Sequence, residues 1–326
     1  MKKRSRAAKL LHLLWIIPLA LAAAFAVMMY AIPAFERAGG AEVAGSADWM
    51  ARLPDDMGLD KVVLPGTHDS AANDVQLAFF SKCQALTVGE QLEAGFRYLD
   101  IRLGEDGSRL KLMHGFANCL EGPMPWSEPL YLDTVLDECS AFLDAHPTEC
   151  ILFAVKHEHG DLDDASFMLL MRVYIMKDPD RWLLTDSIPT VGEARGRIVL
   201  LRRFRAEGDL PSGLPLIWKD QDGNDDTSLD TARVDNGSYT LYVQDRFEYG
   251  AGDKWAAFRR GMKNAGEGIA LNFLSTKGTA AYGHPYSFAK DLNARLMAEE
   301  DLSGWVIVDF ASSELAEHIY EMNFRN

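Results

Sequence analysis

The chain has 326 residues, of which 48% are hydrophobic and 25% are charged, and its formal net charge at pH 7 is −15. The composition is that of a globular protein, and the length suits a single α/β barrel with a sizeable core. Nucleic acid is excluded as an expected partner by this charge, and electrostatic adsorption to anionic lipid is disfavoured, so membrane contact would depend on apolar side chains.

Residues 1–36 combine a basic start with a long apolar stretch. Five basic residues lie within the first nine positions, and residues 10–35 contain no Asp, Glu, Lys or Arg. About 20 apolar residues span a bilayer as a helix, whereas a cleaved signal peptide has an apolar region of about 7–15 residues. We therefore expect a membrane anchor over 1–36 with its basic end in the cytoplasm, a linker over 37–50, and an extracytoplasmic catalytic barrel over 51–326. Cleavage of the segment, for example after Ala47, with secretion of the domain, remains the alternative.

Short apolar runs alternate with amphipathic helical stretches along the rest of the chain. The runs are 61–66, 96–103, 110–115, 150–157, 197–204, 241–247, 268–273 and 305–310. Almost continuously apolar strands between helices are typical of a parallel sheet covered by helices, and eight of them predict a (β/α)8 barrel of the TIM type. Because residues 205–240 show no helical period, we expect the barrel to be irregular there, and we expect a monomer.

Charged and polar side chains end most of these runs, where a barrel of this type carries its active site. They include His68, Asp69, Asp100, Arg102, His114, Lys156, Arg203, Asp245 and Asp309. Residues two apart on a strand share a face, so that Asp100 points with Arg102 and Asp309 with Ile307. If those faces line the barrel, the polar groups converge at one mouth.

Two histidines among carboxylates and cations can cleave a phosphodiester by proton transfer. One histidine removes a proton from a hydroxyl nucleophile while a second, protonated histidine supplies one to the leaving oxygen. An arginine between them can hold the phosphate oxygens, and neighbouring carboxylates raise the pKa of a histidine.

A metal site is the competing interpretation of the same residues. The carboxylates could hold calcium, and His157 with His159 resembles half of a metal site. Arg102, however, is a fixed cation two residues from Asp100 and would repel a metal ion. We therefore expect metal-free chemistry without a cofactor.

Four cysteines, Cys83, Cys119, Cys139 and Cys150, lack the CxxC spacing of a metal site. In an oxidising compartment they could form two disulfides in any of three pairings, or they could be buried thiols. Both possibilities remain open.

The order of these motifs resembles that of the bacterial phosphatidylinositol-specific phospholipases C. The resemblance runs from about Leu64 to Tyr320 through LPGTHDS, FRYLDIR, a strand ending in HG, HPTECILFAVKHE, ARGRIVLLRR, VQDRF, LNF and GWVIVDF. It implies cleavage of membrane phosphatidylinositol to diacylglycerol and a 1,2-cyclic inositol phosphate. Whether glycosylated inositol lipids are accepted stays open.

The resemblance also implies roles for individual residues. His68 matches the general base, oriented by Asp309, and His114 matches the general acid, assisted by Asp69. Arg102 stands where calcium-independent members carry their phosphate-binding arginine. The positions that would hold the inositol are Lys156, Arg203, Asp245, Phe247 and Asp100. The family's stacking tyrosine is Phe247 here, which keeps the ring but loses a hydroxyl.

Access to a lipid requires apolar side chains at the rim of the site. The candidates are Phe79, Phe80, Trp126 and Tyr282. Two other functions remain open: a metal-dependent glycerophosphodiester phosphodiesterase, and a catalytically inactive module that binds inositol lipids at the cell surface.

Overall fold

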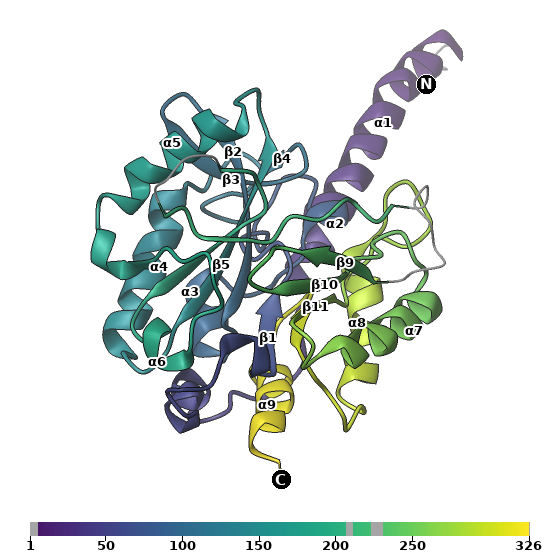
Figure 1. Ribbon diagram of the computed structural model, residues 1–326. Helices are drawn as coiled ribbons and strands as arrows, with labels where there is room; N and C mark the ends of the chain where they lie inside the picture. Colours follow the sequence, from purple (N-terminus) through teal and green to yellow (C-terminus); the bar gives the residue numbers. More distant parts are fainter. Residues whose placement is uncertain (1–5, 207–210, 223–230, 326) are drawn as a thin grey trace.

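The computed structural model describes residues 6–206, 211–222 and 231–325, with side chains from residue 15 onward. Lys2, Lys3 and Arg4 of the predicted cytoplasmic cluster lie outside the described residues, as do 207–210 and 223–230 of the region predicted to lack a helix. Figure 1 shows a curled sheet with helices around it and one long helix, α1 (Arg6–Ala26), projecting away from the rest. The α/β architecture predicted from the alternation of apolar runs and amphipathic stretches is confirmed.

Over the described residues, one mixed sheet of twelve strands forms the centre of the molecule. The strands are β1 (Leu64–Thr67), β2 (Tyr98–Asp106), β3 (Arg109–His114), β4 (Ala117–Asn118), β5 (Ile151–His159), β6 (Trp182–Leu183), β7 (Ile198–Arg202), β8 (Leu214–Pro215), β9 (Ala232–Asp235), β10 (Thr240–Gln244), β11 (Ile269–Phe273) and β12 (Trp305–Val308). Neighbours follow the order β6-β7-β5-β2-β1-β12-β11-β10-β9, and the pairs from β6 through to β10 are all parallel. Parallel strands present their carboxyl ends at one edge, which is where the predicted site residues are gathered.

The curled sheet is open on one side within the described residues. β8 pairs with β7 and β9 pairs with β10, but no ladder joins β8 to β9. The described residues between β7 and β10 contain no helix, in agreement with the composition of this region. The predicted irregularity of the barrel therefore lies at this opening.

The third apolar run is not a strand of the parallel barrel, contrary to its prediction. β3 is antiparallel to β2, and the two are joined by the turn residues Gly107 and Ser108, with Gly107 at a φ of 62°. The two-residue loop Gly107-Ser108 is a hairpin signal that the alternation of runs obscured. Leu110 and Leu112 pack with the outer cluster rather than inside the barrel, and the hairpin carries His114 back to the strand ends.

The helices cover the sheet and bound its loops. They are α2 (Ala78–Ser81), α3 (Val88–Glu93), α4 (Leu132–Ala145), α5 (Asp164–Ile175), α6 (Val191–Ala194), α7 (Ala251–Gly261), α8 (Pro285–Leu296) and α9 (Ser313–Tyr320). Short turns of helix are η1 (Val27–Ala31), η2 (Pro33–Phe35), η3 (Ser46–Arg52), η4 (Leu59–Lys61), η5 (Pro179–Arg181), η6 (Met262–Asn264) and η7 (Glu321–Phe324). Local sequence fixes several starts: Thr87 and Glu90 form a capping box at α3, each side chain accepting from the other residue's backbone N–H.

Alternation along β2 separates the core from the site. Leu99, Ile101 and Leu103 pack in one cluster with residues of α4 and α5. Tyr98 belongs to a second cluster with Leu201 and Ile307. Asp100 and Arg102 alternate with the first set, so they share the face of Tyr98, as the two-residue period predicts.

Gly66 lets the strands beside β1 approach closely. A Cβ at this position would lie 2.4 Å from Cδ1 of Ile307 and 2.7 Å from Cβ of Tyr98. Any side chain here would push β12 or β2 away from β1. The glycine of the LPGTHDS motif therefore sets the spacing of the two strand ends that carry His68 and Asp309.

The N-terminal segment contains the one helix, among the described residues, that is long and apolar enough to cross a membrane. The candidate span is Trp15–Phe35, with a mean hydropathy of 2.2, and only 6% of it is buried against the protein. Further along the chain, η3 is part of the domain, because its residues Trp49 and Met50 are fully buried in the core.

Candidate active site

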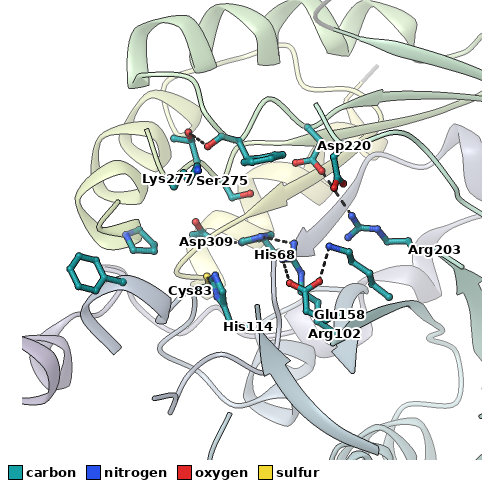
Figure 2. Close-up of a pocket in the computed structure, with 16 residues that line it drawn as sticks. His68, Cys83, Arg102, His114, Glu158, Arg203, Asp220, Ser275, Lys277 and Asp309 are labelled. Carbon is teal, nitrogen blue, oxygen red and sulfur yellow. Dashed lines mark hydrogen bonds and ion pairs between the residues drawn. The ribbon is translucent and has the colours of Figure 1, made fainter. Parts of the chain in front are cut away.

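A cavity of about 250 Å³ opens at the carboxyl ends of the parallel strands (Figure 2). Its lining residues are His68, Phe80, Cys83, Arg102, His114, Lys156, Glu158, Arg203, Asp220, Asp245, Phe247, Ser275, Thr276, Lys277, Pro285 and Asp309. Eight of the ten predicted site residues are in this set. The other two, Asp69 and Asp100, are buried directly behind it and contact His114 and Arg102.

His68 follows β1 and is fixed through both ring nitrogens. Its Nδ1 lies 2.7 Å from Oδ1 of Asp309, and its Nε2 lies 2.9 Å from Nη2 of Arg102. A guanidinium can only donate, so Nε2 accepts from Arg102 and Nδ1 carries the proton that is donated to Asp309. The ring is thus held as the tautomer with its proton on Nδ1, and Arg102 engages the electron pair of Nε2.

Arg102 lies at the centre of the charged cluster. Its Nε donates to Oδ2 of Asp100 at 3.0 Å, and its Nη1 donates to Oε1 of Glu158 at 3.4 Å. These two carboxylates orient the guanidinium from its buried side and leave the outer edge, beside His68, toward the cavity. A planar guanidinium held in this way suits a phosphate group.

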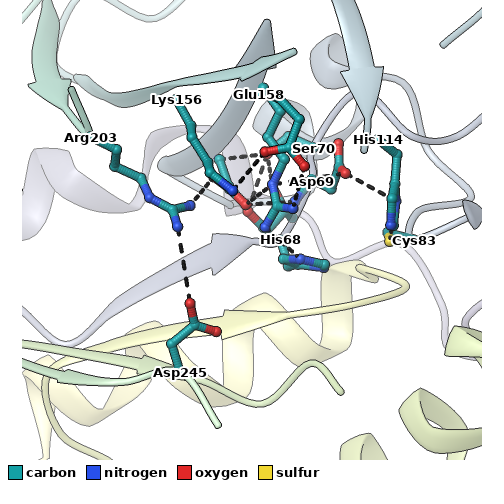
Figure 3. Close-up of polar contacts among 12 residues, drawn as sticks. His68, Asp69, Ser70, Cys83, His114, Lys156, Glu158, Arg203 and Asp245 are labelled. Atoms are coloured by element: carbon teal, nitrogen blue, oxygen red, sulfur yellow. Dashed lines mark hydrogen bonds and ion pairs between the residues drawn. The ribbon is translucent and has the colours of Figure 1, made fainter. Parts of the chain in front are cut away.

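His114, at the end of β3, faces His68 across the cavity, with ring centroids 6.3 Å apart. Its Nδ1 lies 3.0 Å from Oδ2 of Asp69 in an ionic contact that is not aligned as a hydrogen bond, and 3.5 Å from Sγ of Cys83 (Figure 3). Burial, the largest single influence, lowers the pKa of His114, but the interactions with Asp69 and the charge of Glu158 together outweigh it and raise the pKa. His114 is thereby suited to carry a proton, with Nε2 free to deliver it.

Two arginines stabilise the carboxylate of Asp100, which is fully buried. Arg203 donates to its Oδ1 at 2.9 Å, opposite the bond from Arg102 to Oδ2. Burial opposes ionisation, but the two guanidinium groups hold the pKa of Asp100 well below its usual range. The carboxylate therefore stays charged and holds both arginines in place.

Glu158 is a site residue that the sequence interpretation left out. Its carboxylate lies 2.7 Å from Nζ of Lys156 and accepts from the backbone N–H of Gly115 at 3.1 Å. Despite burial, Arg102 and Lys156 hold its pKa well below the usual range. The signal was present, because Glu158 is two residues beyond Lys156 on β5 and so shares its face.

The backbone is unusual directly after each residue of the His68–Asp309 pair. Asp69 has a φ of 40° and Phe310 a φ of 52°, both in the left-handed region that side chains disfavour. Such conformations cost on the order of 1–3 kcal/mol and persist where surrounding contacts fix them. Here Asp69 N–H donates to Asp100 and Phe310 N–H donates to the carbonyl of Cys83. The chain is bent where His68 and Asp309 must meet.

On the side of the cavity away from His114, charged side chains pack against aromatic rings. Arg203 stacks with its Cζ 4.1 Å from the Trp218 ring centre, and Trp218 donates to Oδ2 of Asp245 at 3.3 Å. Phe247 lines the same side, with the ammonium of Lys277 5.7 Å from its ring centre. Trp218 and Lys277 were not predicted, since neither lies within an apolar run.

In the part of the chain that the structure describes, two groups of three side chains bring possible metal-ligand atoms within 4.8 Å of one another. They are His68, Cys83 and Asp309, and Asp69, Cys83 and His114. Both groups include the thiol of Cys83, whose pKa is raised by burial, and both lie beside the guanidinium of Arg102. Neither property favours a bound cation.

The histidine pair considered as half of a metal site lies elsewhere on the rim. His157 pairs with Oε2 of Glu105 at 3.0 Å and stacks on Phe167 at 4.4 Å, whereas His159 is exposed. All four cysteines are free and buried, so the alternative of buried thiols applies in this structure.

The predicted rim aromatics differ in exposure. Trp126 is 79% exposed and Tyr282 68%, while Phe79 and Phe80 are partly buried and Phe80 lines the cavity. Phe116, two residues after His114, is a further exposed aromatic that was not predicted.

The expected resemblance to the bacterial phosphatidylinositol-specific phospholipases C is confirmed by comparison with curated proteins. The chain is 26% identical over 285 residues to a 1-phosphatidylinositol phosphodiesterase of Staphylococcus aureus, covering 81% of this chain and 88% of the relative. A protein of the same name from Listeria monocytogenes is 30% identical over 166 residues, 47% of each chain. A human PI-PLC X domain-containing protein 1 is 31% identical over 148 residues, 43% of each. No protein-family model matches.

Solved structures of the same kind share the fold. A variant of the phosphatidylinositol-specific phospholipase C from Staphylococcus aureus superposes with a TM-score of 0.70 at 23% identity, over 85% of this chain and 97% of that one. The enzyme from Listeria monocytogenes gives 0.64 at 22% identity, over 85% and 98%. The predicted TIM-type class of the irregular barrel is confirmed by these neighbours.

Proposed function

We propose that the protein is a phosphatidylinositol-specific phospholipase C that forms diacylglycerol and a 1,2-cyclic inositol phosphate without a metal. The observation that carries the proposal is the pair of opposed histidines with Arg102 between them, one held as an acceptor and the other favoured as a donor. The curated relatives, named as phosphodiesterases of the same lipid, support the substrate.

His68 is the general base of this mechanism. In the absence of substrate, Arg102 occupies its Nε2. When a phosphate accepts from Arg102 instead, Nε2 is released to take the proton of the inositol 2-hydroxyl, whose oxygen attacks phosphorus. Asp309 then stabilises the imidazolium that forms, because it already accepts from Nδ1.

His114 is the general acid. The bond between phosphorus and the glycerol oxygen breaks, and that oxygen takes the proton from Nε2 of His114. Asp69 keeps the ring protonated before this step. Each proton transfer contributes roughly 10²–10⁴-fold to the rate.

The remaining predicted residues hold the headgroup. Lys156, Arg203 and Asp245 supply charged hydrogen-bonding groups around the side of the cavity away from His114, and Phe247 supplies a ring face. Asp100 contributes indirectly by fixing both arginines. Phe116, Trp126 and Tyr282 supply exposed apolar surface for the lipid interface.

The protein acts outside the cytoplasm in this proposal, on the membrane in which its N-terminal helix is anchored. The uncharged span Trp15–Phe35 and the basic residues before it support this orientation. Intact-mass measurement of the mature protein tests it, since loss of the first 47 residues would indicate secretion instead.

The central prediction is calcium-independent cleavage of phosphatidylinositol in mixed micelles, measured as release of water-soluble inositol phosphate. His68→Ala and His114→Ala should each lose at least about 10²-fold in kcat, because each removes one proton-transfer group. His318→Ala, a change on α9 far from the cavity, is the matched control and should keep its rate. Full activity of either site variant would contradict the assignment.

A metal-dependent glycerophosphodiester phosphodiesterase is the second enzymatic candidate, and chelation separates the two. EDTA should leave the proposed activity intact and abolish the alternative. Phosphorus NMR of the products identifies the nucleophile. A transient cyclic phosphate indicates attack by the inositol hydroxyl, and direct formation of the monoester indicates attack by water. A module that binds inositol lipid without cleaving it would give neither product.

A further inference from the structure

The end of the apolar N-terminal helix is packed against the rim of the active-site cavity. Figure 1 shows the end of α1 beside α2. η1, the turn that follows α1, contacts α2, and Met29 within it is fully buried. α2 carries Phe79 and Phe80, and Phe80 lines the cavity. The candidate anchor therefore ends beside the mouth, whereas α9 and the C-terminus lie at the opposite end of the molecule.

A specific polar contact holds the chain just after the span. Glu36 is buried, and its Oε1 lies 2.7 Å from Nε2 of His284. His284 stacks on Phe79 with ring centres 4.1 Å apart and an interplanar angle of 6°. The next residue, Pro285, lines the cavity. A buried carboxylate is costly without a partner, so this contact fixes the chain direction at the end of the span.

The end of the span and the rim of the cavity both expose apolar side chains. Ile32 is 45% exposed and Phe35 85%, although they follow a turn that is packed on the domain. On the rim, Tyr282 contacts Phe80 of α2 with ring centres 5.9 Å apart and is also exposed. A surface of this kind suits the interface of the bilayer that contains the helix, because the span itself must enter that bilayer.

We propose that residues 27–37 are a rigid mount that turns the cavity mouth toward the membrane holding the anchor. The occupant of the apolar rim is this phospholipid bilayer, and the contact of Glu36 with His284 maintains the orientation. The lipid that enters the cavity therefore comes from the same bilayer. This last step rests on the proposed activity, whereas the orientation rests only on the proposed membrane anchor.

The orientation can be measured without any reaction. Full-length protein is reconstituted in phosphatidylcholine vesicles, with an environment-sensitive fluorophore attached at Tyr282→Cys, while the four native cysteines are buried. A nitroxide-labelled lipid should quench this fluorophore. The control is Met297→Cys, an exposed position at the far end of α8, about 18 Å from Pro285 along the helix, and it should not be quenched.

Variants of Glu36 and His284 test whether their contact maintains the orientation. Glu36→Ala and His284→Ala should each lower the quenching at residue 282 at least twofold, while Glu36→Gln, which keeps an acceptor oxygen, retains it. In phosphatidylinositol vesicles the two alanine variants should lose at least fivefold in rate, with cleavage of a soluble short-chain phosphatidylinositol unchanged. Equal quenching at 282 and 297, or quenching that the alanine variants leave unaltered, overturns the mount. Loss of short-chain cleavage in the parent protein instead refutes the proposed function.

Discussion

Asp69 faces His114 with one carboxylate oxygen and lies 3.8 Å from Nε of Arg102 with the same atom. It is thus placed between the proposed acid and the proposed phosphate ligand. Its charge raises the pKa of His114 against the effect of burial, and its left-handed backbone turns the side chain toward that ring. A single residue therefore couples the shape of the β1 end to the protonation of a histidine on another strand.

Asp69→Asn should move the alkaline limb of the pH profile to lower pH. The active form requires neutral His68 and protonated His114, so activity falls on the alkaline side as His114 loses its proton. Removing the carboxylate charge leaves burial as the main influence on His114, which lowers its pKa. We expect a loss on the order of 10–100-fold in kcat/KM near pH 8 and a smaller loss near pH 6. A uniform loss at every pH would show that Asp69 acts only on the fold.

The polar residues at the strand ends could be predicted, because side chains alternate between the two faces of a strand and this leaves a two-residue period in the sequence. Asp100 and Arg102 share a face two residues apart, and the structure places them in one contact. Gln84 was not predictable in this way. It donates to the carbonyls of His68 and Val308 and accepts from Ala311, joining the ends of β1 and β12 from a loop with no periodic pattern.

At the level of elements, the two ends of the barrel differ in chemistry. The carboxyl ends of the strands carry the charged cavity, while the amino ends carry a buried ion pair. Arg97, directly before β2, donates to Glu149, before β5, through Nε at 3.0 Å and Nη2 at 2.8 Å. Arg97 also donates to the carbonyl of Ala47, and Glu149 accepts from the backbone N–H of Met50. The pair fastens η3 to the base of the barrel.

Glu149→Gln should destabilise the domain by roughly 3–5 kcal/mol, because it leaves the guanidinium of Arg97 buried without a counter-charge. Both side chains are fully inaccessible to solvent, so water cannot compensate. Urea unfolding of the protein in detergent, followed by tryptophan fluorescence, measures the change. Glu321→Gln breaks an exposed pair with Arg52 and should cost at most about 1 kcal/mol. Similar losses for both variants would contradict the role of burial.

The hairpin of β2 and β3 shows where element-level prediction failed. Run length and apolar content suggested a third barrel strand, yet the turn at Gly107 reverses the chain. His114 still reaches the site, because β3 runs back along the extended end of β2, with Leu112 opposite Leu103, and so ends near Arg102. The structure places His114 in the cavity, whereas the predicted direction of its strand was wrong.

At the scale of the whole molecule, the sequence predicted an apolar anchor and a barrel but not their contact. Glu36 and His284 are 248 residues apart, and a pair so distant leaves no periodic signal. The net charge of the domain, unlike this contact, is the sum of its charged residues and can be obtained from the sequence without knowledge of the fold. Beyond residue 36 the chain carries 28 Lys and Arg against 47 Asp and Glu.

This acidic balance predicts how activity depends on salt and on lipid charge. At 0.01 M salt the Debye length is about 30 Å, so an anionic bilayer repels the acidic domain. Near 0.1 M salt the Debye length falls to about 10 Å, and this repulsion is largely screened. In reconstituted vesicles of constant phosphatidylinositol content, replacing phosphatidylcholine with phosphatidylglycerol should lower the initial rate on the order of two- to fivefold at 0.01 M salt. Added salt should restore it.

The matched control for this salt dependence is cleavage of soluble short-chain phosphatidylinositol, which involves no charged surface and should vary little over the same range. A rate that rises with phosphatidylglycerol and falls with salt would instead reveal a basic surface facing the membrane. In that case attraction between charges, rather than the apolar rim around Tyr282 and Phe35, would hold the mouth at the bilayer.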